Sequence, residues 1–199
     1  MRVTDEANTE ARRTAIIAAA LRCLSRNGVA KTSISDICKE AGIRSGHLYY
    51  YFESKDALLT AILESNQDQT RERIQHMLVG EKDLASKIFD IHLQAEAERS
   101  ALGLTPVVRM ELECYFSRED RSGTLAASGD YLTASIHDAI RQGIADGQLP
   151  EDIDIAAFSA AIILIWNGLA HNRLFAGFDL EENRRAVQTL IRPWLKPAP

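Results

Sequence analysis

The sequence predicts an all-α protein. Apolar residues recur at helical spacing through nearly the whole chain, and no segment alternates convincingly as a strand does. Glycines and prolines stand where these periodic segments end, as expected at helix boundaries. With 199 residues, 46% of them apolar, the chain can bury a substantial core and fits one or two small domains. We expect an N-terminal three-helix domain of the helix-turn-helix type, followed by a larger α-helical domain.

The first helix is expected from about residue 10 to residue 27. One side of it carries an apolar stripe at helical spacing, which would face the core. Gly28 follows, and glycine readily adopts the left-handed conformation that ends many helices. The stripe consists of Ile16, Ile17, Ala20, Leu21 and Leu24.

A short second helix is expected early in the segment Thr32–Lys55. Ser33 and Asp36 fit a capping box, in which a hydroxyl accepts a hydrogen bond from a free amide at the helix start. Apolar residues then repeat at helical spacing as far as Ala41. Gly42 stands where the chain must turn sharply, because a residue without Cβ takes the left-handed conformation at little cost.

The third helix has two contrasting sides. Leu48 and Phe52 lie one turn apart and would be buried, whereas the other faces carry groups that donate hydrogen bonds or stack. Gly46 would let the helix backbone approach a groove wall or base edge closely. Ser54 fits as the cap of the next helix, whose first turn holds Lys55. A cation there is favoured only if an anion such as a phosphate is shared with the free amides, so the segment predicts a DNA surface.

The run from Arg13 through Leu59 resembles the TetR-type bacterial transcription regulators. The similarity covers the alanine-rich first helix ending at Asn27 and Gly28, the TSISDI start, the AG turn, the glycine before LY, the YF pair and the SK-D-LL restart. This resemblance implies a dimeric regulator, usually a repressor, whose larger C-terminal domain binds a small effector and dimerises. Arg44 and the serine after it stand where the family more often has a small residue followed by lysine or arginine. The base preference therefore does not carry over.

We expect the helix-turn-helix residues to divide the work of DNA binding. Tyr49 has an alternative role, in which its ring packs inward against the first helix and only the hydroxyl emerges. The boundaries expected are residues 10–53 for the DNA-binding domain and 54–199 for the effector-binding and dimerisation domain. Sugar-phosphate contacts are expected from Thr32, Ser33, Tyr49, Tyr51 and Lys55, and contacts to base edges or thymine methyls from Arg44, Ser45, Gly46, His47 and Tyr50.

The distribution of charge favours a nucleic-acid partner although the chain has a net charge of −5. From Ala11 to Lys55 eight basic residues face three acidic ones, a local charge of +5, so the rest of the chain carries −10. A positive head on an acidic body would orient the protein toward DNA. Arg22, Arg26 and Lys39, taken singly, are better explained as parts of solvated helix faces.

Six further helices are expected after the head. The first runs from about Ser54 to Val79, stops at Gly80 and links the head to the body. The next three are expected over residues 83–100, 106–116 and 123–146, with Pro106 in a first turn and Gly147 closing the last. The penultimate helix of the chain follows a cap at Asp152 or Asp154, and the last follows a capping pattern made by Asp179 and Glu182.

The last two helices predict a homodimer through residues 153–195. The run IDIAAFSAAIILIWNGLAHNRLF is apolar on most faces, and a chain of this size has few elements left to cover it. Pairing with a symmetry mate would make a four-helix bundle, and the alternative is an ordinary monomer core.

An effector site is expected among the body helices, for a small apolar or amphipathic molecule. His92 and Glu96, one turn apart, offer an alternative metal pair, but no third ligand stands at a helpful spacing, so no metal or cofactor is expected. The effector residues predicted are Phe89, His92, Met110, Glu113, Phe116 and Trp166, each of which has plain core packing as its alternative.

Other classes of protein find little support in the sequence. It has no GxxxxGK[ST], HExxH or GxSxG motif, so the sequence offers little support for the alternative of an enzyme. A second alternative is a helical protein-interaction module without DNA binding. The polar N-terminus does not read as a secretory signal, and the apolar run Ile153–Ala170 falls short of a membrane span, so a cytoplasmic protein is expected. Three widely spaced cysteines, Cys23, Cys38 and Cys114, predict free thiols.

Overall fold

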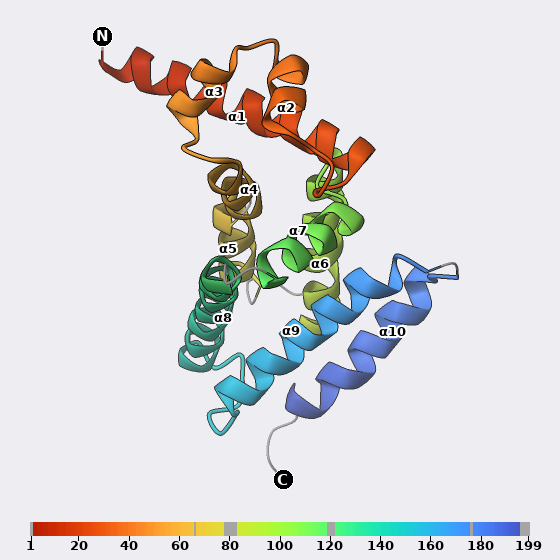
Figure 1. Cartoon of the computed structure of the whole chain (residues 1–199). Coiled ribbons are helices and arrows are strands. Elements are labelled where there is room, and N and C mark those ends of the chain that lie inside the picture. Colours follow the sequence, from red (N-terminus) through yellow and green to blue (C-terminus); the bar gives the residue numbers. More distant parts are fainter. Residues whose placement is uncertain (1, 66, 78–82, 119–121, 176, 196–199) are drawn as a thin grey trace. The chain divides into compact units, whose positions relative to one another are not determined.

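The computed structural model describes residues 2–65, 67–77, 83–118, 122–175 and 177–195. Every regular element within these residues is helical, as the sequence predicts (Figure 1). The helices are α1 (Arg2–Asn27), α2 (Ile34–Ala41), α3 (Ser45–Tyr51), α4 (Lys55–Glu64), α5 (Gln67–Gln75), α6 (Leu84–Ala101), α7 (Pro106–Arg118), α8 (Ser122–Ala145), α9 (Ile155–Asn172), α10 (Leu180–Ile191) and the short 3-10 helix η1 (Arg192–Leu195).

The chain forms two compact units, and the first is larger than the predicted head. It comprises Met1–Ser65 together with Arg99–Ala126. Buried residues of α1 to α4 share one core with Leu104, Val108, Leu112 and Phe116, so α7 completes it. A head of about 45 residues buries little apolar surface by itself, which is why a helix distant in the sequence completes the core. The first compact unit therefore extends beyond residue 53, and the functional boundary expected there stays a prediction.

The starts and stops of α1, α2 and α3 agree with the sequence except at the start of α1. The Ser33–Asp36 capping box is present, and Gly42 has the left-handed conformation with φ 65°. The predicted side of α1 is buried at Ile16 and Leu24. However, α1 begins at Arg2 and not near residue 10, because no glycine or proline interrupts the preceding residues.

The prediction of one continuous helix from Ser54 to Val79 is wrong, because two helices occupy this segment. Ser54 caps α4 as expected, since its side chain accepts a hydrogen bond from the Ala57 N–H. The helix then ends at Glu64, and α5 starts afresh at Gln67. At the break the Ser65 hydroxyl donates to the Ile62 carbonyl at 2.8 Å, a local bond that competes with the helical ladder. The predicted end of this helix, including Gly80, lies outside the described residues.

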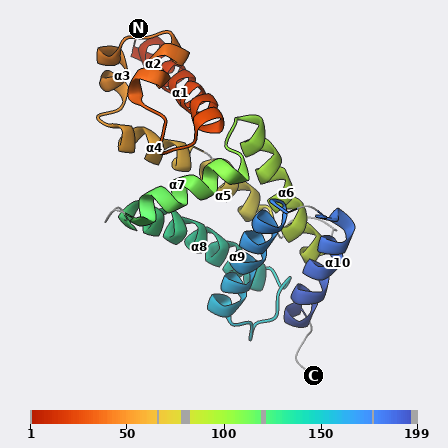
Figure 2. The same ribbon diagram turned by 45° about the vertical axis from the view of Figure 1, so that its right-hand side comes forward.

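The second unit comprises Asn66–Glu98 and Ala127–Pro199 and has its own core. Figures 1 and 2 both show α9 and α10 running beside each other. The Trp166 indole N–H donates to the Ile88 carbonyl at 2.9 Å, and Arg184 pairs with Asp90 at 2.9 Å, so α9 and α10 are both tied to α6. The helices predicted over residues 83–100 and 123–146, and the caps at Asp154 and Asp179, are confirmed to within about one residue.

Candidate nucleic-acid interface

The α2–α3 pair has the geometry of a helix-turn-helix. Gly42 caps α2, and the Ile43 N–H donates back to the Cys38 carbonyl at 3.0 Å, which closes the turn. α3 then begins after Arg44, whose backbone is extended. Leu48 is fully buried and anchors the inner side of α3 in the core of the first unit. The residues of α3 other than Leu48 and the partly buried Tyr51 are exposed.

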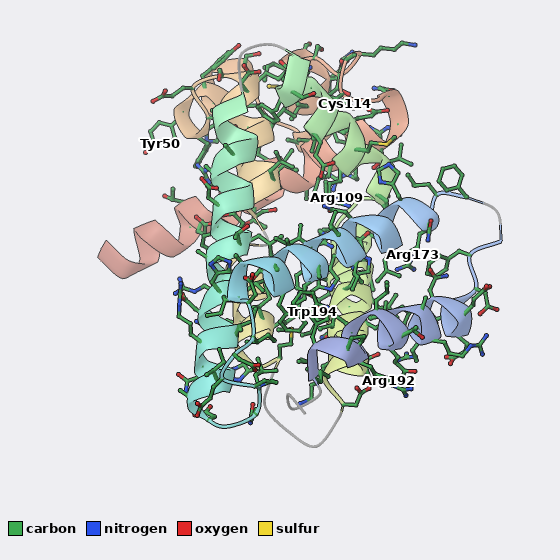
Figure 3. All side chains as sticks on the ribbon, turned by 90° about the horizontal axis from the view of Figure 1, so that it is seen from below. Tyr50, Arg109, Cys114, Arg173, Arg192 and Trp194 are labelled. Carbon is green, nitrogen blue, oxygen red and sulfur yellow. The ribbon has the colours of Figure 1, made fainter. Side chains whose placement is uncertain are left out.

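The outer side of α3 carries most of the residues predicted to meet bases. Tyr50 is 75% exposed and points away from the fold (Figure 3). Tyr49 is half exposed, so its ring is not buried against α1. A Cβ added to Gly46 would meet no described atom within 4 Å, and its backbone is helical, so the internal packing of the unit does not require glycine there. The remaining exposed members of this face are Arg44, Ser45 and His47.

Tyr51 is held more firmly than its neighbours. It is partly buried and lies between His47 and Tyr50, with ring centroids 5.4 and 5.0 Å away. The Arg13 guanidinium donates to the Tyr51 carbonyl at 3.3 Å and stacks over the Phe52 ring, 4.5 Å from its centroid. These contacts fix the end of α3 relative to α1 and orient the aromatic cluster.

The structure corrects the expectation for one predicted backbone contact. Thr32 is only 2% exposed, and its hydroxyl donates to the Gly28 carbonyl at 2.8 Å. Its side chain closes the α1–α2 turn and does not reach the surface. Ser33 is exposed, but its hydroxyl is engaged with Asp36 in the helix cap. A capping hydroxyl and a phosphate-binding hydroxyl have the same sequence signature, which is why the two roles were not separated there.

Lys55 has an internal contact that the sequence did not indicate. Its side chain is partly buried, and its ammonium donates to the Val29 carbonyl at 2.9 Å. The same ammonium lies 5.7 Å from the centroid of the Tyr115 ring. The predicted phosphate ligand is therefore held at the start of α4 by α7 and by the α1–α2 turn.

Part of the positive charge of the head is neutralised locally. Arg22 and Arg26 both bind the Glu40 carboxylate, Arg22 at 2.6 Å. The hydrogen bonds from Arg22 and then Arg26 hold the pKa of Glu40 below its ordinary value of 4.5. The exposed cations Arg12, Lys31 and Arg44 carry no such ion pair within the described residues.

The predicted effector residues are divided between the two units. Phe89, His92 and Trp166 are buried in the second unit. Phe116 is buried in the core of the first unit, whereas Glu113 pairs with Arg109 on the partly exposed side of α7 at 3.1 Å. Met110 is partly buried on the same helix. The set is thus not brought together within one compact unit, and the described residues contain no cluster of three metal-ligating side chains.

The expected free thiols are confirmed for all three cysteines. Cys23 and Cys38 are buried and Cys114 is exposed. Burial raises the pKa of the Cys23 thiol, so it behaves as a core residue. Glu111 and Tyr115 both contact the head from α7, and neither is marked by the sequence as a functional residue. No local pattern marks such contacts, because their partners lie 59 and 82 positions away along the chain.

A second surface stands out on α9. Leu164 is 71% exposed, and Ala156, Ala160 and Gly168, which are also exposed, continue the same side of the helix. On α10, Leu190 is 58% exposed. The sequence predicts that this apolar run is too short for a membrane span, whereas α9 is long and apolar enough to cross a membrane by length and composition alone. Of its 18-residue window, 33% is buried. This side of α9 is therefore an exposed apolar surface.

Comparison with known proteins identifies the relatives of the chain. Residues 16–62 match the family model for bacterial regulatory proteins of the tetR family. The HTH-type transcriptional regulator YvdT of Bacillus subtilis (strain 168) is 41% identical over 191 residues, 91% of each chain. A TetR-family transcriptional regulator from Rhodococcus sp. has the same fold, with a TM-score of 0.76 at 23% identity over 93% of this chain and 98% of that one. FadR of Bacillus subtilis, solved in complex with stearoyl-CoA, gives a TM-score of 0.71 at 18% identity over 93% of this chain and 98% of that one.

Proposed function

Because this chain belongs to the tetR family of bacterial regulatory proteins, and is a DNA-binding transcriptional regulator, we propose that it represses transcription as a homodimer on a near-palindromic operator. A small apolar or amphipathic effector then releases it. Regulators of this family are generally not enzymes. We assign the protein to the cytoplasm, where its DNA lies.

The observation that carries the DNA proposal is the outward face of α3. It combines an arginine, a histidine and two exposed tyrosines around a glycine that internal packing does not require. In the major groove, Arg44 would read a base edge, and Ser45, His47 and Tyr50 would contact bases or thymine methyls. Tyr49, Tyr51, Ser33 and Lys55 would hold the sugar-phosphate backbone, whereas Thr32 is left out because its side chain is buried.

The apolar face of α9 and α10 supports the dimer. An exposed apolar surface on a soluble protein marks an interaction site, and a second copy offers the same surface in return. We assign the interface to residues 153–195, where Leu164 and Leu190 are large exposed apolar side chains. The two heads would then need half-sites about one helical turn, or a multiple of it, apart on one face of the duplex.

The effector proposal rests on the apolar character of the second unit. Phe89, His92 and Trp166 place two aromatic rings and one imidazole in its interior, which suits an apolar body with one polar handle. Met110, Glu113 and Phe116 of α7 stay in the proposed set as a second group. The complex of FadR with stearoyl-CoA supports an amphipathic effector, since that protein has the same fold.

Selection from random DNA tests the central proposal. We expect near-palindromic sites, and sedimentation should give a dimer at working concentration. Asymmetric sites or a monomer would refute the dimeric repressor.

Stearoyl-CoA serves as the first effector probe, titrated with and without the selected operator. A hundredfold loss of operator affinity corresponds to a coupling of about 2.7 kcal/mol, and DNA must then weaken binding of the probe by the same factor.

A further inference from the structure

A single residue in the α1–α2 turn is held by opposite charges at both of its backbone groups. The Val29 N–H donates to the Glu111 carboxylate at 2.7 Å, and the Val29 carbonyl accepts from the Lys55 ammonium at 2.9 Å. Hydrogen bonds to charged groups are roughly twice as strong as neutral ones. The buried Val29 side chain anchors the same residue in the core. Val29 is thus a rigid junction between α7 and the start of α4.

Gly28 makes this junction possible. It has φ 77°, and a Cβ built on it would lie 3.1 Å from the Glu111 carboxylate. A side chain would therefore be strained and would push Glu111 away from the Val29 N–H. The Gly28 carbonyl accepts from Thr32, which completes the bonding of the turn. The close approach of α7 is consequently built into the backbone of the turn.

Tyr115 extends the contact by one helical turn. Its hydroxyl donates to the Asp56 carboxylate at 2.7 Å, and its ring faces the Lys55 ammonium. Asp56 is the only acidic residue in the first turn of α4. A carboxylate beside a phosphate-binding lysine would repel the phosphate and attract the lysine. The tyrosine hydroxyl fixes that carboxylate in place.

We propose that Glu111 and Tyr115 form a polar seat on α7 that positions Lys55 for a DNA phosphate. The inference rests on the proposed DNA binding. An ammonium carries three donors, so a bond to Val29 and a bond to a phosphate are compatible. Lysine side chains lose considerable freedom when they are ordered, and a lysine that is already oriented loses less on binding. Glu111 and Tyr115 are positioning residues, since they act through Lys55 and do not touch DNA.

Conservative variants of the full-length chain test the seat. Glu111→Gln keeps an oxygen that accepts from Val29 but removes the charge, and Tyr115→Phe removes only the hydroxyl. We expect each to weaken binding by on the order of three- to tenfold, on the selected operator and on an unrelated duplex alike. The salt slope should fall toward that of a protein with one phosphate contact fewer. Removing the negative charge of Glu111 would by itself strengthen binding to DNA. A weakening by Glu111→Gln therefore cannot be explained by the change in net charge.

The matched controls are Glu151→Gln, which removes an exposed charge before α9, and Tyr131→Phe on α8. Neither should weaken DNA binding or alter its salt slope. Thermal unfolding of all four variants shows whether each one is folded. A purely structural role for Glu111 would lower the melting temperature without changing the salt slope.

A double-mutant cycle with Lys55→Ala decides the mechanism. If the seat acts through Lys55, adding Glu111→Gln or Tyr115→Phe to Lys55→Ala should cost no further affinity. Independent, multiplying losses would overturn the proposal, as would unchanged DNA binding by both single variants. If the unmodified protein binds no duplex even at low salt, the proposed function itself fails, and the seat fails with it.

Discussion

The outer faces of α3 and α9 both expose large side chains, yet they are built for different partners. On α3 the exposed residue Tyr50 stands among an arginine, a serine and a histidine. On α9 the equally exposed Leu164 stands among alanines and a glycine. The first surface offers hydrogen bonds and stacking, which a groove of DNA can use, and the second offers only area. Exposure of a large side chain therefore indicates an interaction surface, and the chemistry of the neighbouring residues indicates the class of partner.

The largest expected effect comes from placing a charge on the apolar face. Leu164→Glu would bury a carboxylate at the proposed dimer interface, which is strongly unfavourable without a partner. We expect a monomer by sedimentation. Operator affinity should fall by roughly a hundredfold or more, because the two heads no longer bind as one ligand.

An exposed leucine of the first unit provides the control for this change. Leu102 is 54% exposed in the α6–α7 connection, so Leu102→Glu adds the same charge away from α9 and α10. It should leave the dimer intact. A dimeric Leu164→Glu protein would show that the apolar face of α9 has another partner.

The sequence predicts local features well and long-range ones poorly. The caps at Ser33, Asp154 and Asp179 are each determined by residues within one helical turn, and all three are confirmed. The recruitment of α7 to the head core depends on Leu112 and Phe116 meeting residues far away in the chain, and no spacing pattern announces it. The break after Glu64 is not indicated by the sequence, because helical periodicity continues past the polar Ser65.

The candidate DNA-binding residues also fall into those that local sequence predicts and those that depend on distant contacts. The exposed positions of α3 follow from helical periodicity once Leu48 is taken as the anchor. Thr32 and Lys55 are different, because their polar groups are used by the Gly28 and Val29 carbonyls, which only the folded turn brings near. A side chain that can donate to DNA can equally donate to its own backbone. The sequence cannot tell these two uses apart.

The most specific contact expected at α3 is that of Arg44 with a base edge. Arg44→Ala should cost about 1 to 3 kcal/mol and relax the preference at one operator position, as for a bidentate arginine on guanine. Binding measured against single-base variants of the selected operator tests this. Lys31→Ala removes an exposed cation from the same unit and should weaken all sequences alike. An equal loss on every sequence from Arg44→Ala would move that residue to the phosphate-contacting group.

A smaller effect is expected from the cap that supports the α3 surface. Ser33→Ala removes the side chain that accepts from the Asp36 N–H at the start of α2. We expect the free energy of unfolding to fall by about 0.5 to 2 kcal/mol, the usual contribution of an N-cap. Ser35→Ala, on the exposed side of the same helix, is the matched control and should not destabilise the protein. Equal destabilisation by both would show that Ser33 contributes little as a cap.

The smallest effect concerns pH and the charge of the head. Arg22 and Arg26 hold the Glu40 pKa below its ordinary value of 4.5, so the carboxylate stabilises the fold above that pH. This contribution is lost as the pH falls below 4.5 and through the lowered pKa of the folded state. The difference in melting temperature between the wild type and Glu40→Gln should therefore be steady near neutral pH and shrink in acid. Glu53→Gln, which removes an exposed carboxylate after α3, is the comparison variant. A difference in melting temperature that grows in acid would contradict the assigned ion pairs. Glu40→Gln also releases two arginines from their ion pairs, so binding to unrelated DNA should strengthen slightly at low salt.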